Sequence, residues 1–172
     1  KVDHLEFMWH IKKKILNKKN INKLINNEKK INYSNQKLYK DYQKFIENRR
    51  DELLKTIRSL KNKNYKIAGY GASAKSTTFL NFFKIDSNKI NFIADLNPMK
   101  QFKFSPGSNI KILPPSEIYK QKINYIIILS WNFSKEIINE NIKFIENGGK
   151  FILPFPKIIT VNKNNYKFFL NT

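Results

Sequence analysis

A glycine-rich turn at residues 69–75 has the residue types that bind phosphate. It matches the dinucleotide fingerprint G-x-G-x-x-A: Gly69 permits a tight turn, Gly71 lets the backbone approach a phosphate, and Ala74 allows close helix–strand packing. Lys75 falls in the first turn of the helix expected next, where a cation is unfavourable unless an anion is bound. A surface lysine is the alternative interpretation of Lys75. The turn therefore predicts a phosphate-bearing ligand.

The same segment also approaches the P-loop pattern, as G-x-x-x-x-A-K-S. Ala74 stands where that loop requires glycine, and its Cβ obstructs the consecutive amides that wrap a phosphate, which counts against an NTPase. In a P-loop protein Asp95 would imitate the acid that steadies magnesium. In a dinucleotide-binding domain it would end the second strand and bind a ribose hydroxyl. A capping or salt-bridged aspartate is the structural alternative.

Aromatic and amide side chains follow a later apolar run. Trp131 and Phe133 can stack on a base or sugar, and Asn132 can hydrogen-bond one. Core packing is the alternative for either aromatic residue taken alone.

Short apolar runs alternate with helical periodicities from residue 65 onward. The run from Tyr125 to Ser130 is uninterrupted, which is typical of a parallel strand buried on both faces. Ser116 and Ser134 are candidate N-caps of two helices, and Gly148 and Gly149 are expected to end the second helix with positive φ. Alternating strands and helices predict a mostly parallel sheet with right-handed crossovers. The strands are expected at residues 65–69, 90–95, 110–113, 125–130 and 150–153.

Four unusual clusters each follow the carboxyl end of an expected strand. In an open parallel sheet those ends share one edge, and ligands bind in the crevice along it. We therefore expect the clusters to lie together around one pocket. They are Gly69–Lys75, Asp95–Gln101, Ser130–Phe133 and Pro154–Pro156.

The parts outside the sheet have simpler patterns. Apolar residues between about 35 and 60 recur at helical spacing, which predicts a long amphipathic helix that packs on a sheet or links domains. Residues 1–20 alternate weakly, and we expect an edge strand or linker left from a preceding domain. Residues 21–172 are expected to form one domain, with its sheet core at 65–156 and an added strand or hairpin in the tail at 157–172.

Composition narrows the classes of function. The formal charge of +20 is typical of nucleic-acid-binding proteins, but the chain has only three arginines, the residue type that base readout favours. Cysteine is absent, and His4 and His10 lack the i, i+4 spacing of a helical metal pair, so no metal site is expected. The longest apolar run is far shorter than the ~20 residues that span a bilayer. We expect a soluble, cytoplasmic protein with nucleic-acid binding as an alternative.

Five ordered motifs resemble the C-terminal domain of S-adenosylmethionine-dependent sugar C-methyltransferases. They are GYGASAKS at 69–76, FIADLNPMKQ at 92–101, SPG at 105–107, LSWNF at 129–133 and GGKFILPFP at 148–156. With the helix before them they cover about residues 21–159. The resemblance implies an α/β, Rossmann-like domain with helices on both faces of the sheet, preceded by the long helix. It also implies that this domain packs against an upstream S-adenosylmethionine-binding domain and helps to hold a nucleotide-linked ketosugar for C-methylation.

The candidate substrate-binding residues combine the motif matches with the residue chemistry above. They are Gly69, Tyr70, Gly71, Ala72, Ser73, Lys75, Asp95, Asn97, Lys100, Trp131, Asn132 and Phe133. Two departures from the family's pattern matter: Ser76 stands where the family usually has glycine, and Phe102-Lys103 replaces a usual Gly-Arg. Loop shape and anion contacts are therefore expected to differ.

The family's zinc module, methyl-donor domain and catalytic Tyr/His/Glu group have no counterpart in these motifs. No catalytic residue is carried over, and we expect this chain by itself to bind no S-adenosylmethionine and to methylate nothing. The alternatives are a free-standing Rossmann domain that binds NAD or another nucleotide, a nucleic-acid-binding protein and a degenerate P-loop NTPase. For an NAD enzyme, no His or Cys follows Gly71, which leaves Tyr or Lys as the general acid.

Overall fold

The computed structural model describes residues 18–31 and 35–171 and divides into two compact units, residues 1–46 and residues 47–172. Helix α2 (Lys18–Ile31) and the beginning of helix α3 (Gln36–Asn62) belong to the first unit. Residues 18–20, the end of the segment expected to be a remnant strand or linker, form the first turn of α2, because Ile21, Leu24 and Ile25 continue a helical spacing. The rest of that segment, residues 1–17, lies outside the described residues. The boundary at residue 20 stays a prediction.

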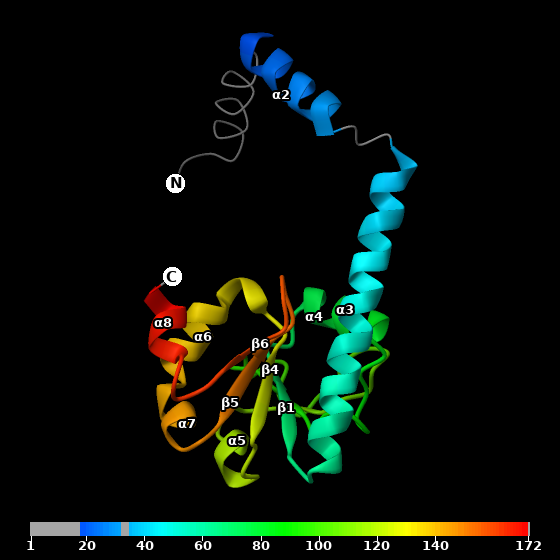
Figure 1. Cartoon of the computed structure of the whole chain (residues 1–172). Coiled ribbons are helices and arrows are strands. Elements are labelled where there is room, and N and C mark those ends of the chain that lie inside the picture. Colours follow the sequence, from blue (N-terminus) through cyan, green and yellow to red (C-terminus); the bar gives the residue numbers. More distant parts are fainter. Residues whose placement is uncertain (1–17, 32–34, 172) are drawn as a thin grey trace. The chain divides into compact units, whose positions relative to one another are not determined.

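The second unit is built on a six-stranded sheet (Figure 1). Its strand order is β3-β2-β1-β4-β5-β6, and all neighbours are parallel except β5 and β6. This is the order of doubly wound nucleotide-binding sheets, which reverses direction between β1 and β4. The predicted mostly parallel α/β fold is confirmed. The strands are β1 (Ile67–Tyr70), β2 (Ile93–Ala94), β3 (Ile112–Leu113), β4 (Tyr125–Ile128), β5 (Lys150–Leu153) and β6 (Ile159–Val161).

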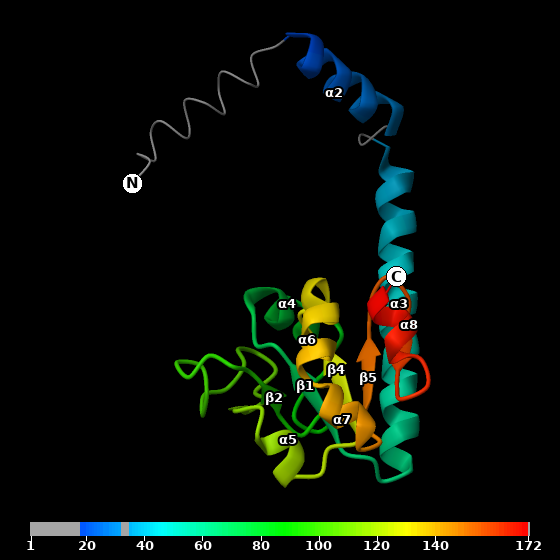
Figure 2. The ribbon, with the colours of Figure 1, turned by 90° about the vertical axis from the view of Figure 1, so that its left-hand side faces the viewer.

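Helices cover both faces of this sheet, as predicted (Figures 1 and 2). On one face lie α4 (Ala74–Phe82) and the C-terminal half of α3, whose Leu53 and Ile57 are buried. On the other lie α5 (Glu117–Lys120), α6 (Ser134–Glu140), α7 (Ile142–Glu146) and α8 (Tyr166–Asn171). The long helix expected at about 35–60 is present as α3.

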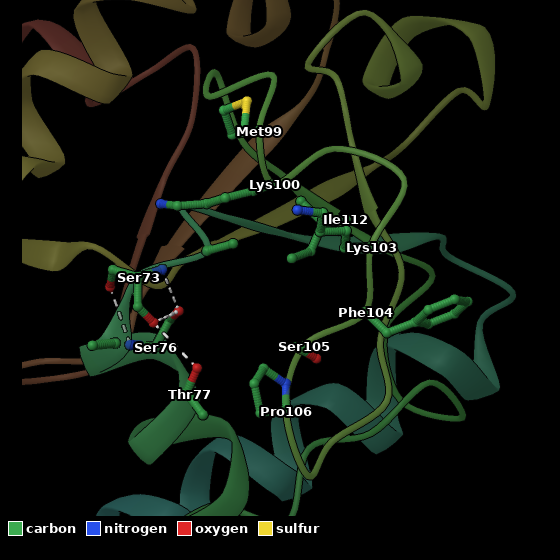
Figure 3. Close-up of a pocket in the computed structure, with 12 residues that line it drawn as sticks. Ser73, Ser76, Thr77, Met99, Lys100, Lys103, Phe104, Ser105, Pro106 and Ile112 are labelled. Carbon is green, nitrogen blue, oxygen red and sulfur yellow. Dashed lines mark hydrogen bonds between the residues drawn. The ribbon is translucent and has the colours of Figure 1, made fainter.

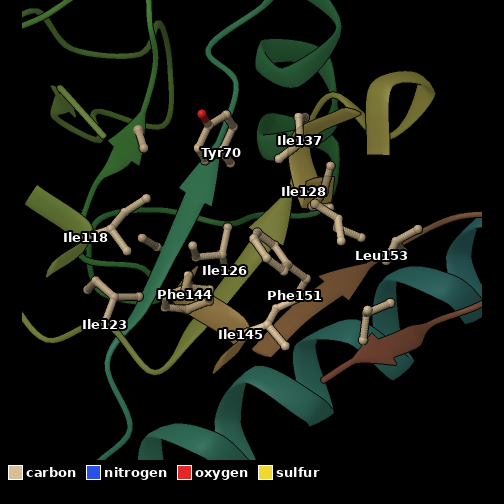
Figure 4. Close-up of a cluster of buried hydrophobic side chains, with 14 of the residues drawn as sticks. Tyr70, Ile118, Ile123, Ile126, Ile128, Ile137, Phe144, Ile145, Phe151 and Leu153 are labelled. Carbon is tan, nitrogen blue, oxygen red and sulfur yellow. The ribbon is translucent and has the colours of Figure 1, made fainter. Parts of the chain in front are cut away.

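The core of the α5–α7 face is an isoleucine-rich cluster (Figure 4). Ile126 and Ile128 of β4 point into it, whereas Ile127 between them is buried on the opposite face. Full burial of one such side chain contributes about 1.5–3 kcal/mol to folding. This two-sided burial explains why the strand has no polar position.

Three local predictions need correction. Ser134 does not cap α6: the 3₁₀ turn η1 (Trp131–Phe133) runs directly into the helix, so Ser134 is already its first residue. The single helix expected after it is divided at Asn141, whose Nδ2 donates to the Ile137 carbonyl at 2.7 Å. Gly148 has a φ of +88°, but Gly149 does not need positive φ and is glycine because the Phe144 ring packs against it.

Two further differences concern helix ends and the tail. Ser116 occupies the N-cap position of α5, but its side chain makes no capping hydrogen bond. The tail forms the added strand that was expected, β6, which pairs antiparallel with β5. It then continues into helix α8, which the sequence did not predict. Tyr166, Phe169 and Leu170 of that segment pack against the isoleucine-rich cluster. Within the described ranges no helix is both long and apolar enough to cross a membrane.

Candidate functional site

The glycine turn begins where β1 ends at the carboxyl edge of the sheet. Gly71 has a φ of +95°, a conformation that favours glycine. A Cβ at Gly71 would overlap the Ser130 hydroxyl and lie 3.0 Å from the Ser130 Cβ. Glycine is therefore required here both because of the positive φ and because a side chain would collide with Ser130, the residue that precedes the Trp131–Phe133 segment.

A capping box closes the start of α4. The Ser76 amide donates to Ser73 Oγ at 3.1 Å, and the Ser73 amide donates to Ser76 Oγ at 2.7 Å. Ser76 Oγ also donates to the Ser73 carbonyl at 2.6 Å. Reciprocal bonds of this kind satisfy donors that a helix otherwise leaves unpaired. Ser76, which stands where the family usually has glycine, is thus a structural part of this turn.

Asp95 joins the glycine turn to the loop after β2. Its Oδ2 accepts the Ala72 amide at 2.6 Å, and its Oδ1 accepts the Asn97 amide at 2.8 Å. Lys100 Nζ lies 3.6 Å from Oδ2. The Asp95 side chain is buried, so these contacts take the place of the water molecules that would otherwise solvate its carboxylate. Of the three roles considered for Asp95, the structure shows the contacts of the structural one, and a ligand contact of Asp95 stays a prediction.

A pocket of about 280 Å³ opens between the start of α4 and the loop between β2 and β3 (Figure 3). Hydroxyls and the Lys100 and Lys103 side chains line part of it, and apolar atoms of Met99, Phe104 and Ile112 line the rest. Such a mixed lining suits a ligand with both an anionic and an apolar part. The lining residues are Ala72, Ser73, Ala74, Ser76, Thr77, Met99, Lys100, Lys103, Phe104, Ser105, Pro106 and Ile112.

Three of the twelve sequence-predicted residues line this pocket: Ala72, Ser73 and Lys100. Asn97 uses its Oδ1 to accept the Met99 amide at 2.9 Å, which shapes its own loop. Gly69 lies in β1 and faces Leu129, where a Cβ would lie 3.3 Å from Leu129 Cγ. Some of the predicted residues thus line the pocket, whereas others, such as Asn97 and Gly69, shape the loop or pack within the sheet.

Tyr70 lies on the opposite face of the sheet from the pocket. Its ring belongs to the isoleucine-rich cluster, and only 5% of the residue is exposed (Figure 4). Burial raises the pKa of its hydroxyl above the ordinary 10.0, and a hydrogen bond with the Asn141 side chain partly opposes that rise. In this structure Tyr70 is a core residue.

The Trp131–Phe133 segment forms a separate aromatic surface beside α4. The Trp131 ring lies 5.0 Å from the Phe155 ring and 5.7 Å from the Phe79 ring, measured between centroids. Lys75 Nζ lies 5.2 Å from the Trp131 centroid, in cation–π range. Asn132 and Phe133 are exposed. These residues adjoin the glycine turn through Gly71 and Lys75, but none of them lines the pocket.

The pocket wall at residues 103–106 was not among the predicted site residues. Ser105 is buried there, its Oγ shares a hydrogen bond with Ser108 Oγ at 2.6 Å, and it accepts the Ile110 amide at 3.0 Å. Gly107, with a φ of +74°, lies against the Asn81 side chain. The Ser-Pro-Gly motif at 105–107 was the sequence signal for this pocket wall, because a glycine at positive φ indicates a tightly folded loop.

The site contains lysine side chains and hydroxyl groups, which are groups suited to contact an anion. No group of three or more His, Cys, Asp or Glu side chains gathers to hold a metal ion in residues 18–31 and 35–171.

Comparison with known proteins gives the family. One relative is the C-methyltransferase NovU of Streptomyces niveus, 33% identical over 119 residues, which are 69% of this chain but 28% of that protein. Among solved structures, UDP-D-quinovosamine 4-dehydrogenase from Vibrio fischeri aligns with 59% of this chain and 97% of its own at 16% identity. Its TM-score is 0.41. The model of the C-methyltransferase C-terminal domain matches residues 5–156, so the chain belongs to that family.

Proposed function

We propose that this chain is the substrate-holding domain of a cytoplasmic, S-adenosylmethionine-dependent sugar C-methyltransferase. In this proposal it binds the phosphate groups of a nucleotide-linked ketosugar. Another part of the whole enzyme binds S-adenosylmethionine and transfers the methyl group. Family membership supports the methyltransferase context. The pocket beside Lys100 and Lys103 is the observation on which the ligand assignment depends.

The charges at the pocket favour phosphate. Lys100 is half-buried and lines the pocket together with Ala72 and Ser73 of the glycine turn. Lys103 belongs to the same lining. The nearby start of α4 adds the positive end of a helix dipole, which favours anions. The Ser73 and Thr77 hydroxyls offer further polar contacts at the same wall.

The pocket's size indicates how much of the ligand this chain holds. Sites that enclose a whole drug-sized ligand have volumes of about 300–1,000 Å³. The cavity here, at about 280 Å³, suits a diphosphate and one adjoining group. The remainder of a nucleotide-linked sugar would extend beyond it, which agrees with a domain that presents its ligand to a second domain.

Titration calorimetry with thymidine diphosphate, uridine diphosphate, NAD, ATP and a short DNA duplex tests this proposal. We expect a nucleoside diphosphate to bind more tightly than NAD, ATP or DNA. Lys100→Ala and Lys103→Ala should each weaken that binding about 5-fold, because a charge-assisted hydrogen bond from a partly or fully exposed lysine contributes roughly 1 kcal/mol.

Lys135→Ala is the matched control, because Lys135 is an exposed lysine on α6 that does not line the pocket. Its binding should equal that of the unmodified chain. Tight NAD binding would contradict the proposal, as would binding only of DNA that is lost with added salt.

A further inference from the structure

The amides of the glycine turn already have acceptors within the protein. The Gly71 amide donates to the Ala94 carbonyl at 2.8 Å. The Ala72 amide donates to Asp95 Oδ2 at 2.6 Å, and the Ser73 amide donates to Ser76 Oγ at 2.7 Å. In a dinucleotide-binding turn the backbone at this place approaches the pyrophosphate. Here three consecutive donors are paired before any ligand arrives.

The acceptor at Ala72 is itself an anion. Asp95 is only 8% exposed, and its second oxygen is held by the Asn97 amide. A phosphate that took the Ala72 amide would break its hydrogen bond to Asp95 Oδ2 and leave a buried carboxylate oxygen without that donor, which is costly. A phosphate that approached without displacing it would meet a like charge at close range.

The same carboxylate holds a cation at the pocket. Lys100 Nζ is 3.6 Å from Asp95 Oδ2, and Lys100 is also part of the pocket lining. Figure 3 shows the Lys100 side chain extended along one edge of the pocket toward the side where Ser73 lies. Asp95 therefore occupies the Ala72 amide of the glycine turn, and the same carboxylate pairs with Lys100, which lines the pocket.

We propose that Asp95 is a built-in anion that closes the glycine turn to the phosphate of any external ligand. It directs that phosphate into the pocket beside Lys100 and Lys103. Asp95 is thus a specificity-determining residue that acts against dinucleotides, whose pyrophosphate requires the turn. This inference rests on the proposed function in one respect, because it concerns where the phosphate of that ligand binds.

Backbone NMR of the ¹⁵N-labelled full chain, titrated with inorganic pyrophosphate, tests the inference residue by residue. In the unmodified chain we expect shifts at the Lys100, Lys103 and Thr77 amides and none at Ala72. In Asp95→Ala and Asp95→Asn the Ala72 amide should shift on titration, because its acceptor is gone or has lost its charge.

Asp86→Ala is the matched control. It also removes one carboxylate that pairs with a lysine, Lys89 at 3.1 Å, but away from the turn. It should keep the pattern of the unmodified chain, which separates release of the turn from a general gain in positive charge.

Amide hydrogen exchange in the unmodified chain provides a check that needs no variant. The Ala72 amide should exchange more slowly than the amide of Ala74, the first residue of α4. A pyrophosphate-induced shift at Ala72 in the unmodified chain would overturn the inference. So would folded Asp95 variants whose Ala72 amide does not respond. If the unmodified chain binds no nucleoside diphosphate while the Asp95 variants open the turn to pyrophosphate, the proposed function fails and the inference stands.

Discussion

Gly71 and Ser130 are in direct contact, although 59 residues separate them in the chain. Gly71 adopts a φ of +95° immediately after β1, and Ser130 leads out of β4. The two strands are adjacent and parallel, with Tyr70 paired to Ile128, so their carboxyl ends lie at the same level. This contact is where the glycine turn meets the Trp131–Phe133 segment.

Gly71→Ala should destabilise the domain by about 1–3 kcal/mol, because it combines positive φ with a steric overlap. Gly148→Ala is the control, since Gly148 has a similar φ of +88° but no neighbouring atom within 4 Å of the place its Cβ would take. Urea unfolding measures both. Equal losses of stability in the two variants would show that the Ser130 contact has no energetic effect. Adding Ser130→Ala to Gly71→Ala should restore part of the loss.

Ser73→Ala and Ser76→Ala should each lower the free energy of unfolding by about 1 kcal/mol, because each removes one side of the capping box. The double variant should lose less than the sum of the two, since the bonds depend on one another. Thr78→Ala, at an exposed position on α4, should have a much smaller effect. Additive losses in chemical denaturation would contradict the reciprocal geometry.

The Lys75–Trp131 pair should show a coupling energy of about 0.5–1 kcal/mol, the range for an exposed cation–π contact. A double-mutant cycle with Lys75→Met and Trp131→Leu measures it from unfolding free energies. The same cycle between Lys75 and the exposed Phe133 serves as the reference. A coupling no larger than that reference would mean that the two side chains are adjacent without mutual stabilisation.

Stability should fall at alkaline pH partly because of Tyr70. Burial raises the pKa of its hydroxyl in the folded state above the ordinary 10.0, so ionisation favours the unfolded chain. The contribution is fully present below about pH 10 and is lost as the pH rises further. Tyr70→Phe should therefore show a shallower loss between about pH 9 and 11 than the unmodified chain.

Tyr39→Phe is the control for that experiment, because Tyr39 is 58% exposed. It should follow the pH dependence of the unmodified chain in thermal or urea unfolding. An unchanged alkaline slope in Tyr70→Phe would contradict the predicted role of the buried hydroxyl.

Local sequence patterns were sufficient to predict the fold class. Strands buried on both faces need continuous apolar runs such as Tyr125–Leu129, and these alternate along the chain with helical spacings, so a parallel sheet followed. The helix from Gln36 to Asn62 was predicted to within two residues at each end, because its apolar stripe is long and regular. Helix α8 was missed, since its six residues are too few to show a period.

For the site, the sequence by itself predicted that a glycine turn, an aspartate loop and an aromatic segment each follow the carboxyl end of a parallel strand and so share one edge of the sheet. Only the tertiary structure decided what each residue does there. Tyr70 and Gly71 are consecutive, yet one enters the core and the other opens the turn, and a strand buried on both faces gives no polarity signal to tell its two sides apart. Likewise, Asp95 binds the Ala72 amide across 23 residues. Such a pairing depends on how two strand ends come together in space, which local residue order does not encode.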